Sequence, residues 1–382
     1  MSTDVLQIYQ GQDFYVPYFE VKVGDQPLER EAIHDITQVS YRDSLTEIDS
    51  FEITINNWDA EARTFKYSDR DLFDPGARVE LYMGYMGRDR TRLMCTGEIT
   101  SLRPAFPAAG QPTLVVSGLN LLHTLRGQQR SVPYVKMTDS KIARQVAKRL
   151  PADIDTNAEA ARNEEEHDYI LQDNQYDLLF LLERARRNGY DLFVVEGKER
   201  TVGGKTRPRI YFGPSQDVRR VSYELTYGKS LIEFQPDLST AQQVGKVTVH
   251  GWDAVKKKAI NITVNIGQLD IAGVGAKGGQ ARINKSFQDR EEVISNIPVA
   301  TEREGRTLAK ETLSRILKNM LKGSGSVVGL PDLRAGSVIF IRGVGERFSG
   351  RYFVTATTHT IGDGGYTTQF QCRREELKGS QQ

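Results

Sequence analysis

Three strand-like runs separated by glycine turns occupy the C-terminal part of the chain. β-Branched and aromatic residues dominate each run, and glycine residues stand in the turns between them. This pattern is typical of an antiparallel meander, in which short turns join neighbouring strands, rather than of a catalytic pocket. The runs cover residues 336–343, 348–355 and 364–372.

The same region has a weak counterpart much earlier in the chain. A shift of 259 residues without a gap aligns the two segments at several identical positions. If the match reflects duplication, the chain contains one barrel-like unit twice; the alternative is chance agreement. The identical pairs are Val79 with Val338, Gly84 with Gly343, Arg88 with Arg347, Arg92 with Arg351 and Thr96 with Thr355, while Leu81 falls on Phe340 and Leu102 on Ile361.

Composition excludes several classes of protein. The 51 basic and 50 acidic residues nearly cancel, so a general basic surface for nucleic acid is not expected. The start lacks the basic and apolar regions of a signal peptide, and no apolar run approaches the roughly 18 residues of a membrane span. We expect synthesis in the cytoplasm and no membrane insertion. Cys95 and Cys372 predict neither a disulfide framework nor a zinc site, and we expect buried, inert thiols.

Local patterns divide the 382 residues into β-rich and α+β parts. Strand signals and turn residues predict a first β-barrel over residues 1–126, with runs at 15–23, 36–41, 50–55, 78–83, 92–101 and 113–117. An inserted α+β module is predicted over residues 127–222. It contains a helix from Asp139 to Leu150, a second helix that Asn174 can cap and Gly189 ends, and a hairpin of residues 191–196 and 209–212.

Strand signals then return, and we assign residues 223–266 and 325–377 to a second β-barrel. Residues 267–324 are predicted to be a glycine-rich insertion followed by an amphipathic helix. Thr301 and Glu304 form a capping box at its start, apolar residues line one face as far as Leu321, and Gly323 ends it. Residues 378–382 are expected to be a disordered tail.

Two glycine-rich motifs resemble phosphate-binding loops. Residues 273–278 satisfy the spacing G-x-G-x-x-G, but no alternating strand and helix pattern surrounds them. Residues 204–206 mimic the end of a phosphate loop, but Glu199 stands where the first glycine is required. We therefore expect a flexible loop, a hairpin turn and no cofactor.

Catalytic and metal-binding patterns are weak. The histidines never recur at zinc-protease spacing, and residues 164–167 are interpreted as a solvated acidic surface. Asp43, Glu47 and Asp49 could serve a glycosidase, although fifty acidic residues make such a grouping unavoidable. We predict no catalytic, cofactor-binding or metal site, and no enzymatic activity. An aromatic N-terminus (Tyr9, Phe14, Tyr15, Tyr18 and Phe19) could stack on sugars or bases, but strand packing or a protein interface explains it better.

The C-terminal motifs resemble the signature of the phage late control protein D family, the baseplate hub proteins of contractile tails and contractile injection systems. These hubs are similar to the hub portion of the valine-glycine repeat spike proteins of type VI secretion. The order of barrel, insertion and second barrel also fits this family. The residues that carry the resemblance are Gly329, Pro331, Gly336, Val338, Gly343, Phe348, Gly350, Tyr352, Val354, His359, Gly365, Tyr366 and Phe370.

The resemblance implies a mainly β fold with two related antiparallel β-barrel (tube) domains and a helix-containing inserted α+β module. It implies a homotrimer whose six barrels form a pseudo-sixfold ring between a hexameric inner tube and a trimeric spike. No spike domain follows Glu375, so we expect the spike to be a separate protein. Baseplate wedge or tape-measure proteins are further expected partners, within a phage tail (virion), a tailocin or an injection particle. No specific nucleic acid is expected.

Two alternatives from other classes remain open at this point. One is a tail-associated peptidoglycan or polysaccharide hydrolase, which would depend on one or two carboxylates. The other is a carbohydrate-binding β module that uses the aromatic N-terminus.

Overall fold

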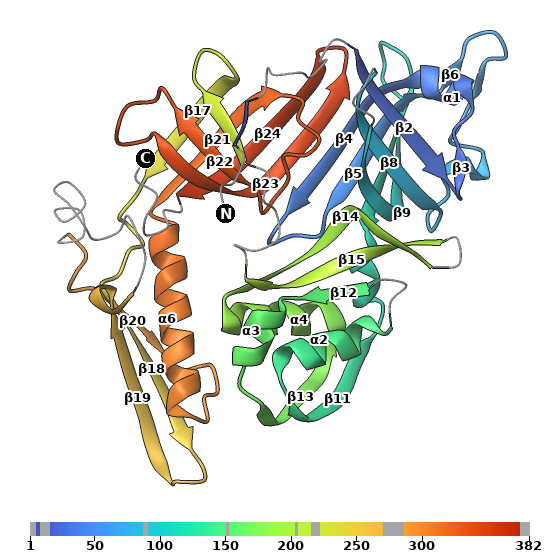
Figure 1. The fold of residues 1–382 in the computed structure, drawn as a ribbon. Helices are drawn as coiled ribbons and strands as arrows, with labels where there is room; N and C mark the ends of the chain where they lie inside the picture. The colour runs from blue at the N-terminus through green and yellow to red at the C-terminus, as the bar shows by residue number, and fades with distance from the viewer. Residues whose placement is uncertain are drawn as a thin grey trace.

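A computed structural model describes residues 5–7, 16–86, 91–149, 153–202, 205–214, 222–269 and 286–374. Fourteen strands form one large sheet, from which an inserted module and a helix-bearing unit both extend on one side (Figure 1). The predicted mainly β fold with an α+β insertion is confirmed. The sheet contains β1 (Val5–Gln7), β2 (Pro17–Val23), β3 (Gln26–Pro27), β4 (Ile36–Ser44), β5 (Ser50–Asn56), β8 (Arg78–Tyr85), β9 (Arg92–Ala105), β10 (Thr113–Asn120), β16 (Ser222–Thr226), β17 (Leu231–Leu238), β21 (Leu321–Val328), β22 (Val338–Arg342), β23 (Gly350–Gly362) and β24 (Gly365–Arg374).

The large sheet consists of two curled halves, each with its own apolar core. The N-terminal half-sheet pairs in the order β4-β5-β10-β9-β8-β2-β3 and the C-terminal half-sheet in the order β17-β21-β24-β23-β22-β16-β1. If the first five strands of each half-sheet are numbered in the order in which they occur along the chain, both half-sheets have the same spatial order, 1-2-5-4-3. The strand order therefore supports the predicted duplication. The sixth strand differs, because β2 is antiparallel to β8 whereas β16 is parallel to β22.

The irregularities of the two half-sheets coincide as well. A bulge leaves Thr100 extra in the pairing of β9 with β10, and another leaves Thr355 extra in the pairing of β23 with β24. Each threonine hydroxyl donates across the bulge, Thr100 to the carbonyl of Ser117 at 3.5 Å and Thr355 to that of Gln371 at 3.2 Å. Equal bulges with equal hydrogen bonds indicate one structural unit present twice.

A glycine turn before β8 and β22 gives a third correspondence. Gly76 and Gly336 have φ values of +94° and +87°, a region that favours glycine. The amide of Gly76 donates to the carbonyl oxygen of Ile99, and the amide of Gly336 donates to that of Val354, both at 2.8 Å. The signature glycine at 336 therefore has an equivalent in the N-terminal half-sheet that the sequence comparison did not identify.

The ungapped alignment of the two halves is wrong in detail. The pairing of β8 with β9 corresponds to the pairing of β22 with β23. This correspondence makes Leu81 equivalent to Ile341, which is 260 positions later, and Cys95 equivalent to Gly350, which is 255 positions later. The connection from β8 to β9 is thus five residues longer than that from β22 to β23, and no ungapped shift can match both strands. A shift of 259 misplaces β8 by one residue, which reverses the faces of a strand.

Two of the three helices of the inserted module pack with two small sheets around one core, to which the helix of residues 158–163 contributes no buried residue. The predicted first helix begins at Asp139 as expected but ends at Ala147, before the predicted Leu150. The Gly189 stop with left-handed φ of +66° and the predicted hairpin are observed. The second helix begins at Asp177, and Asn174 belongs to the preceding strand instead of capping it. The elements are β11 (Gln129–Met137), α2 (Asp139–Ala147), β12 (Asp153–Thr156), α3 (Ala158–Asn163), β13 (His167–Tyr176), α4 (Asp177–Asn188), β14 (Tyr190–Val202) and β15 (Lys205–Pro214).

The second extension, here called the α6 unit, is a three-stranded sheet covered by one long helix. Its central strand β18 (Lys246–Asp253) pairs antiparallel with β19 (Lys258–Asn265) and parallel with β20 (Glu291–Ile294). The sequence had placed residues 246–265 in the second barrel, because strand character does not reveal which sheet a strand joins. Helix α6 (Glu302–Lys318) is capped by Thr301, whose hydroxyl accepts from the amide of Glu304 at 3.1 Å, as predicted.

The end of α6 lies earlier than predicted. The helix stops at Lys318 and β21 begins at Leu321, so the second barrel resumes four residues before the predicted position 325. Met320 and Leu321 are buried apolar residues and continue the helical periodicity by coincidence. No helix of the described residues has the length and hydropathy to cross a membrane. The remaining short elements are α1 (Arg30–Asp35), β6 (Trp58–Asp59), β7 (Thr64–Phe65), η1 (Asp71–Phe73), η2 (Leu121–Arg126) and η4 (Ile266–Gln268).

Candidate functional site

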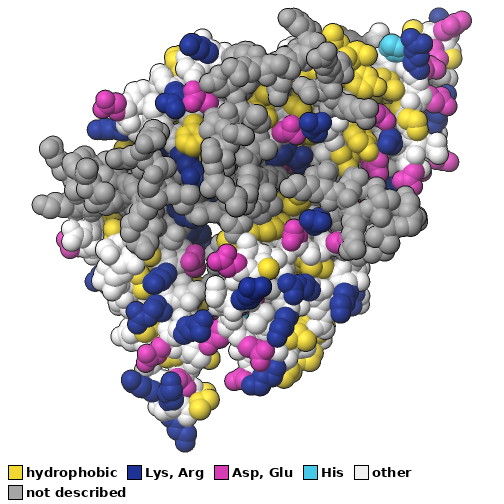
Figure 2. Space-filling model, in the orientation of Figure 1, with side chains coloured by type: hydrophobic (Ala, Val, Ile, Leu, Met, Phe, Trp, Pro, Cys, Tyr) yellow, Lys and Arg dark blue, Asp and Glu magenta, His cyan; other side chains and the backbone are white. Residues whose placement is uncertain are grey.

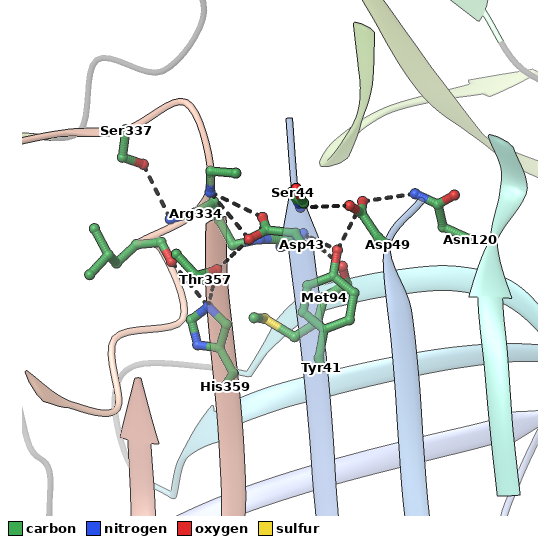
Figure 3. Close-up of polar contacts among 12 residues, drawn as sticks. Tyr41, Asp43, Ser44, Asp49, Met94, Asn120, Arg334, Ser337, Thr357 and His359 are labelled. Atoms are coloured by element: carbon green, nitrogen blue, oxygen red, sulfur yellow. Dashed lines mark hydrogen bonds and ion pairs between the residues drawn. The ribbon is translucent and has the colours of Figure 1, made fainter. Parts of the chain in front are cut away.

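The two half-sheets meet where β4 pairs antiparallel with the second part of β23, and buried polar side chains fill this junction (Figure 3). Its centre is Arg334, which precedes β22 and is 8% exposed. Arg334 Nε donates to Asp43 Oδ2 at 2.6 Å. Its Nη2 donates to Tyr41 Oη at 2.6 Å and to the carbonyl oxygen of Met94 at 3.0 Å. One cation of the C-terminal half-sheet thus binds three acceptors of the N-terminal half-sheet.

Asp43 accepts hydrogen bonds from several donors of the junction. Besides Arg334, the amide of Ala335 lies 3.2 Å from both carboxylate oxygens, and the Thr357 hydroxyl donates to Oδ1. Burial opposes a charge on Arg334, but the neighbouring Tyr41 and Asp43 raise its pKa above the ordinary value. The cation therefore stays charged in this buried position, where a carboxylate and fixed dipoles replace water.

Asp49, which precedes β5, extends the network to the end of β10 in the N-terminal half-sheet. It accepts from the Ser44 amide at 3.0 Å and from Asn120 Nδ2 at 2.7 Å, and the Tyr41 hydroxyl lies 3.2 Å away. Burial raises the pKa of Tyr41 well above its ordinary value. Tyr41 is therefore neutral and can accept from Arg334 while it donates to Asp49.

His359, a signature residue on β23, closes the network on the other side. Its Nε2 lies 3.0 Å from the carbonyl oxygen of Leu333, which can only accept, so Nε2 carries the proton. Its Nδ1 then accepts from the hydroxyls of Tyr366 at 3.0 Å and Thr368 at 3.1 Å. Burial lowers the pKa of His359 to about 3, and the nearby Arg334 acts in the same direction.

The low pKa of His359 predicts acid sensitivity. Above pH 6.5 the imidazole is neutral in both folded and unfolded chains and contributes no pH dependence. As the pH falls through 6.5 towards 3, the unfolded chain binds a proton that the folded chain excludes, so stability is lost. We expect the free energy of unfolding to fall by about 2 kcal/mol from this group between pH 7 and pH 5. Urea denaturation at both pH values measures the loss, and His359→Gln should show a smaller one.

The structure places most signature residues in or beside this junction and its C-terminal core. Tyr352, Val354, His359, Tyr366 and Phe370 are buried, while Val338 and Phe348 pack against buried clusters. Gly343, Gly350 and Gly365 have positive φ values of +80°, +140° and +90°. The assignment of all these residues to a family signature remains a prediction. Gly329 contacts the Tyr366 ring, and Pro331 lies in the connection that leads to Arg334.

Sequence reasoning missed the charged part of the junction. Asp43 and Asp49 were considered as glycosidase carboxylates with Glu47, but they are 2% and 4% exposed and bind protein donors. Glu47 is exposed instead and pairs with Arg42 at 2.9 Å. Arg334 lies between the apolar residues Leu333 and Ala335, which are buried. A charged residue between two apolar residues of the motif was the signal in the sequence that could have indicated a buried cation.

The acidic segment at residues 164–167 is not simply solvated. Glu164 accepts from the Ser140 amide at 2.7 Å at the start of α2, and His167 Nε2 lies 3.1 Å from Asp139 Oδ2. Asp139 also binds buried Arg184 at 3.1 Å. Burial opposes ionisation of Asp139, yet His167 and Arg184 hold its pKa well below the ordinary range. The segment therefore belongs to a structural network of the inserted module.

Other predicted features have mixed outcomes. Cys95 and Cys372 are buried as expected, and burial raises the pKa of the Cys372 thiol. Within the described ranges no group of three or more His, Cys, Asp or Glu side chains could hold a metal. Figure 2 shows basic and acidic side chains interspersed over one face of the inserted module and the α6 unit. The G-x-G-x-x-G segment 273–278 and the aromatic residues 9, 14 and 15 lie outside the described residues.

Comparison with solved structures identifies the class of fold. The 43 kDa tail protein of prophage MuSo2 from Shewanella oneidensis matches with a TM-score of 0.68 and 14% identity, over 94% of this chain and 98% of that one. A tail protein from Neisseria meningitidis MC58 gives 0.66 and 14%, over 94% and 97%. A type VI secretion component from E. coli, described as similar to the T4 tail proteins gp27 and gp5, gives 0.58 and 12%, over 94% and 77%.

The fold is therefore that of phage tail proteins and of the related type VI secretion component, which confirms the predicted resemblance at the level of the fold. No curated protein matches the chain in sequence. The chain belongs to the family described as the Alg8 N-terminal domain, which matches residues 15–363.

Proposed function

We propose that this protein is a structural baseplate hub of a contractile tail or contractile injection machine. In this proposal three copies form a ring of six similar half-sheets. The ring joins a hexameric inner tube on one side to a separate trimeric spike on the other. The protein acts without catalysis and without a cofactor, and it assembles into a tail baseplate or injection particle after synthesis in the cytoplasm.

The duplicated five-strand unit carries the proposal. A chain that presents the same unit twice can offer six near-equivalent surfaces as a trimer, which suits a sixfold partner on one side and a threefold partner on the other. The fold shared with tail proteins supports the same conclusion. The signature residues remain part of this proposal, with the half-sheets as the two tube domains. The predicted domain limits are kept except that residues 246–265 belong to the α6 unit and the second tube domain resumes at Leu321.

The fixed geometry of the junction also favours a structural role. The Arg334 network is buried, and the three acceptors that Arg334 itself binds lie on strands β4 and β9. Such a network holds the two units at one relative orientation, as a ring of fixed diameter requires. Two of the three carboxylates considered for a hydrolase, Asp43 and Asp49, are part of this network, and the described residues provide no specific observation in favour of that alternative.

Measurement of mass and shape tests the proposal. Sedimentation velocity of the purified chain, alone and mixed with a tube or spike protein from the same genome, should reveal a trimer. Electron microscopy should show a threefold ring with a central hole. A chain that stays monomeric at every concentration and binds neither protein would contradict the proposal.

A further inference from the structure

The internal junction between the half-sheets provides a template for a contact between copies. One edge of β23 is shared, because residues 350–353 pair with β22 and residues 356–361 pair with β4. By the pairing registers, residues 101–106 are equivalent to residues 356–361, and residues 234–238 are equivalent to residues 39–43. Within one chain, residues 356–361 are paired with β4, and this pairing is here called the internal seam. The equivalent segments, residues 101–106 and 234–238, are not paired with each other.

Both of these edges lack a further strand partner within the described residues. Along residues 101–105, β9 pairs with β10 alone, and along residues 234–238, β17 pairs with β21 alone. Sheet edges of this kind present unpaired backbone groups and are ready to meet another chain. The two edges lie on different half-sheets of one chain, so a second copy is the partner whose edge has the matching register.

If the two free edges pair in the register of the internal seam, complementary side chains face each other. Thr358 faces Arg42 in the internal seam, and the equivalent residues Arg103 and Asp237 would then face each other between copies. Arg103 is exposed and contacts Glu52, and no described residue forms an ion pair with Asp237, which is also exposed. Opposite charges on facing positions favour this register over its neighbours.

The positions on either side of the charges are apolar. Buried Thr357 and Asp43 of the internal seam become Leu102 and Leu238, both partly buried. Further along, Phe106 falls opposite Phe234, and Phe106 is 60% exposed. The edges between copies therefore offer apolar contacts where the internal seam uses hydrogen-bonded polar groups.

Two prolines explain why such edges need a specific partner. Pro104 and Pro236 occupy the positions of His359 and Tyr41, which face each other in the internal seam. Neither proline has an amide hydrogen, so a ladder copied from the internal seam is interrupted at this pair. Prolines on edge strands prevent indiscriminate strand addition, and recognition then depends on side chains.

We propose that residues 102–106 of one copy lie antiparallel beside residues 234–238 of a second copy, with Arg103 opposite Asp237. This inference rests on the proposed function, since three such contacts close a ring of three copies. The seam is a side-chain interface with a broken backbone ladder, unlike the continuous ladder between β4 and β23.

Disulfide trapping tests the register directly. In the variant with Arg103→Cys and Asp237→Cys, the two α-carbons of neighbouring copies should lie about 4.5–5.5 Å apart, within disulfide range. Oxidation should give covalent trimers on a non-reducing gel. The matched control combines Arg103→Cys with Gln235→Cys, which is displaced by two residues on the same face and should link poorly.

Charge reversal provides a second measurement at the same exposed positions. Arg103→Asp alone and Asp237→Arg alone should each weaken self-association at least about tenfold, because like charges then face each other. The double variant should regain association. A wild-type trimer whose cysteine pair does not link, or links no better than the displaced pair, would overturn the seam and leave the hub intact. A wild-type monomer that binds no tube or spike protein would overturn both.

Discussion

Replacement of Arg334 by alanine is expected to lower the free energy of unfolding by about 3–5 kcal/mol. The substitution removes the side chain that binds Asp43, Tyr41 and the Met94 carbonyl together. It leaves the Asp43 carboxylate buried without its cation, and the loss of the partner costs more than the pair contributes. Urea denaturation followed by tyrosine fluorescence measures the change.

Arg342→Ala is the matched control for this experiment. Arg342 Nε lies 2.8 Å from Glu224 Oε2, a separation close to the 2.6 Å between Arg334 and Asp43. Its side chain is 60% exposed, so its loss should cost at most about 1 kcal/mol. If the two variants are destabilised equally, burial is not what makes the Arg334 junction important.

The second large effect is expected at a signature glycine. In Gly329→Ala the new Cβ would lie 2.0 Å from Cγ of Tyr366, far inside van der Waals contact. The Tyr366 ring is held by its hydrogen bond to His359 at 3.0 Å and packs 5.4 Å from the Tyr85 ring. Since the ring cannot retreat without breaking these contacts, we expect a loss of about 3 kcal/mol or more.

Gly364→Ala tests whether any added methyl group in this hairpin region is harmful. Apart from Gly364 and its two chain neighbours, no atom of the described residues lies within 4 Å of the position of its Cβ, and its φ is not in the left-handed region. Its melting temperature should match that of the wild type, whereas that of Gly329→Ala should fall by several degrees. A Gly329→Ala chain with wild-type stability would show that Tyr366 can move, and the packing argument would fail.

Local sequence signals were sufficient for most elements. The C-terminal meander follows from strand runs and glycine turns, and α6 begins at its capping box because Thr301 and Glu304 are three residues apart. Ends that depend on tertiary contacts were less predictable. Leu321 fits the apolar stripe of a helix, yet it is the first residue of β21 because it packs in the C-terminal core.

Long-range partners could not be obtained from the sequence. Arg334 and Asp43 are 291 positions apart, and nothing local to either residue indicates the other. The duplication was inferred from the wrong residues, because the longer β8–β9 connection shifts the alignment between one strand pair and the next. Strand order and bulge positions, which depend on pairing, were required to align the two halves.

The shared edge of β23 has a mechanical consequence. A force that pulls the half-sheets apart along the strand direction loads the β4–β23 ladder in shear, so its hydrogen bonds from Ala356 to Ile361 must break together instead of one after another. The Arg334 cation spans the same seam and resists the same displacement. The two halves of one chain should therefore transmit axial load as a single rigid body, whereas the proposed contacts between copies should yield first.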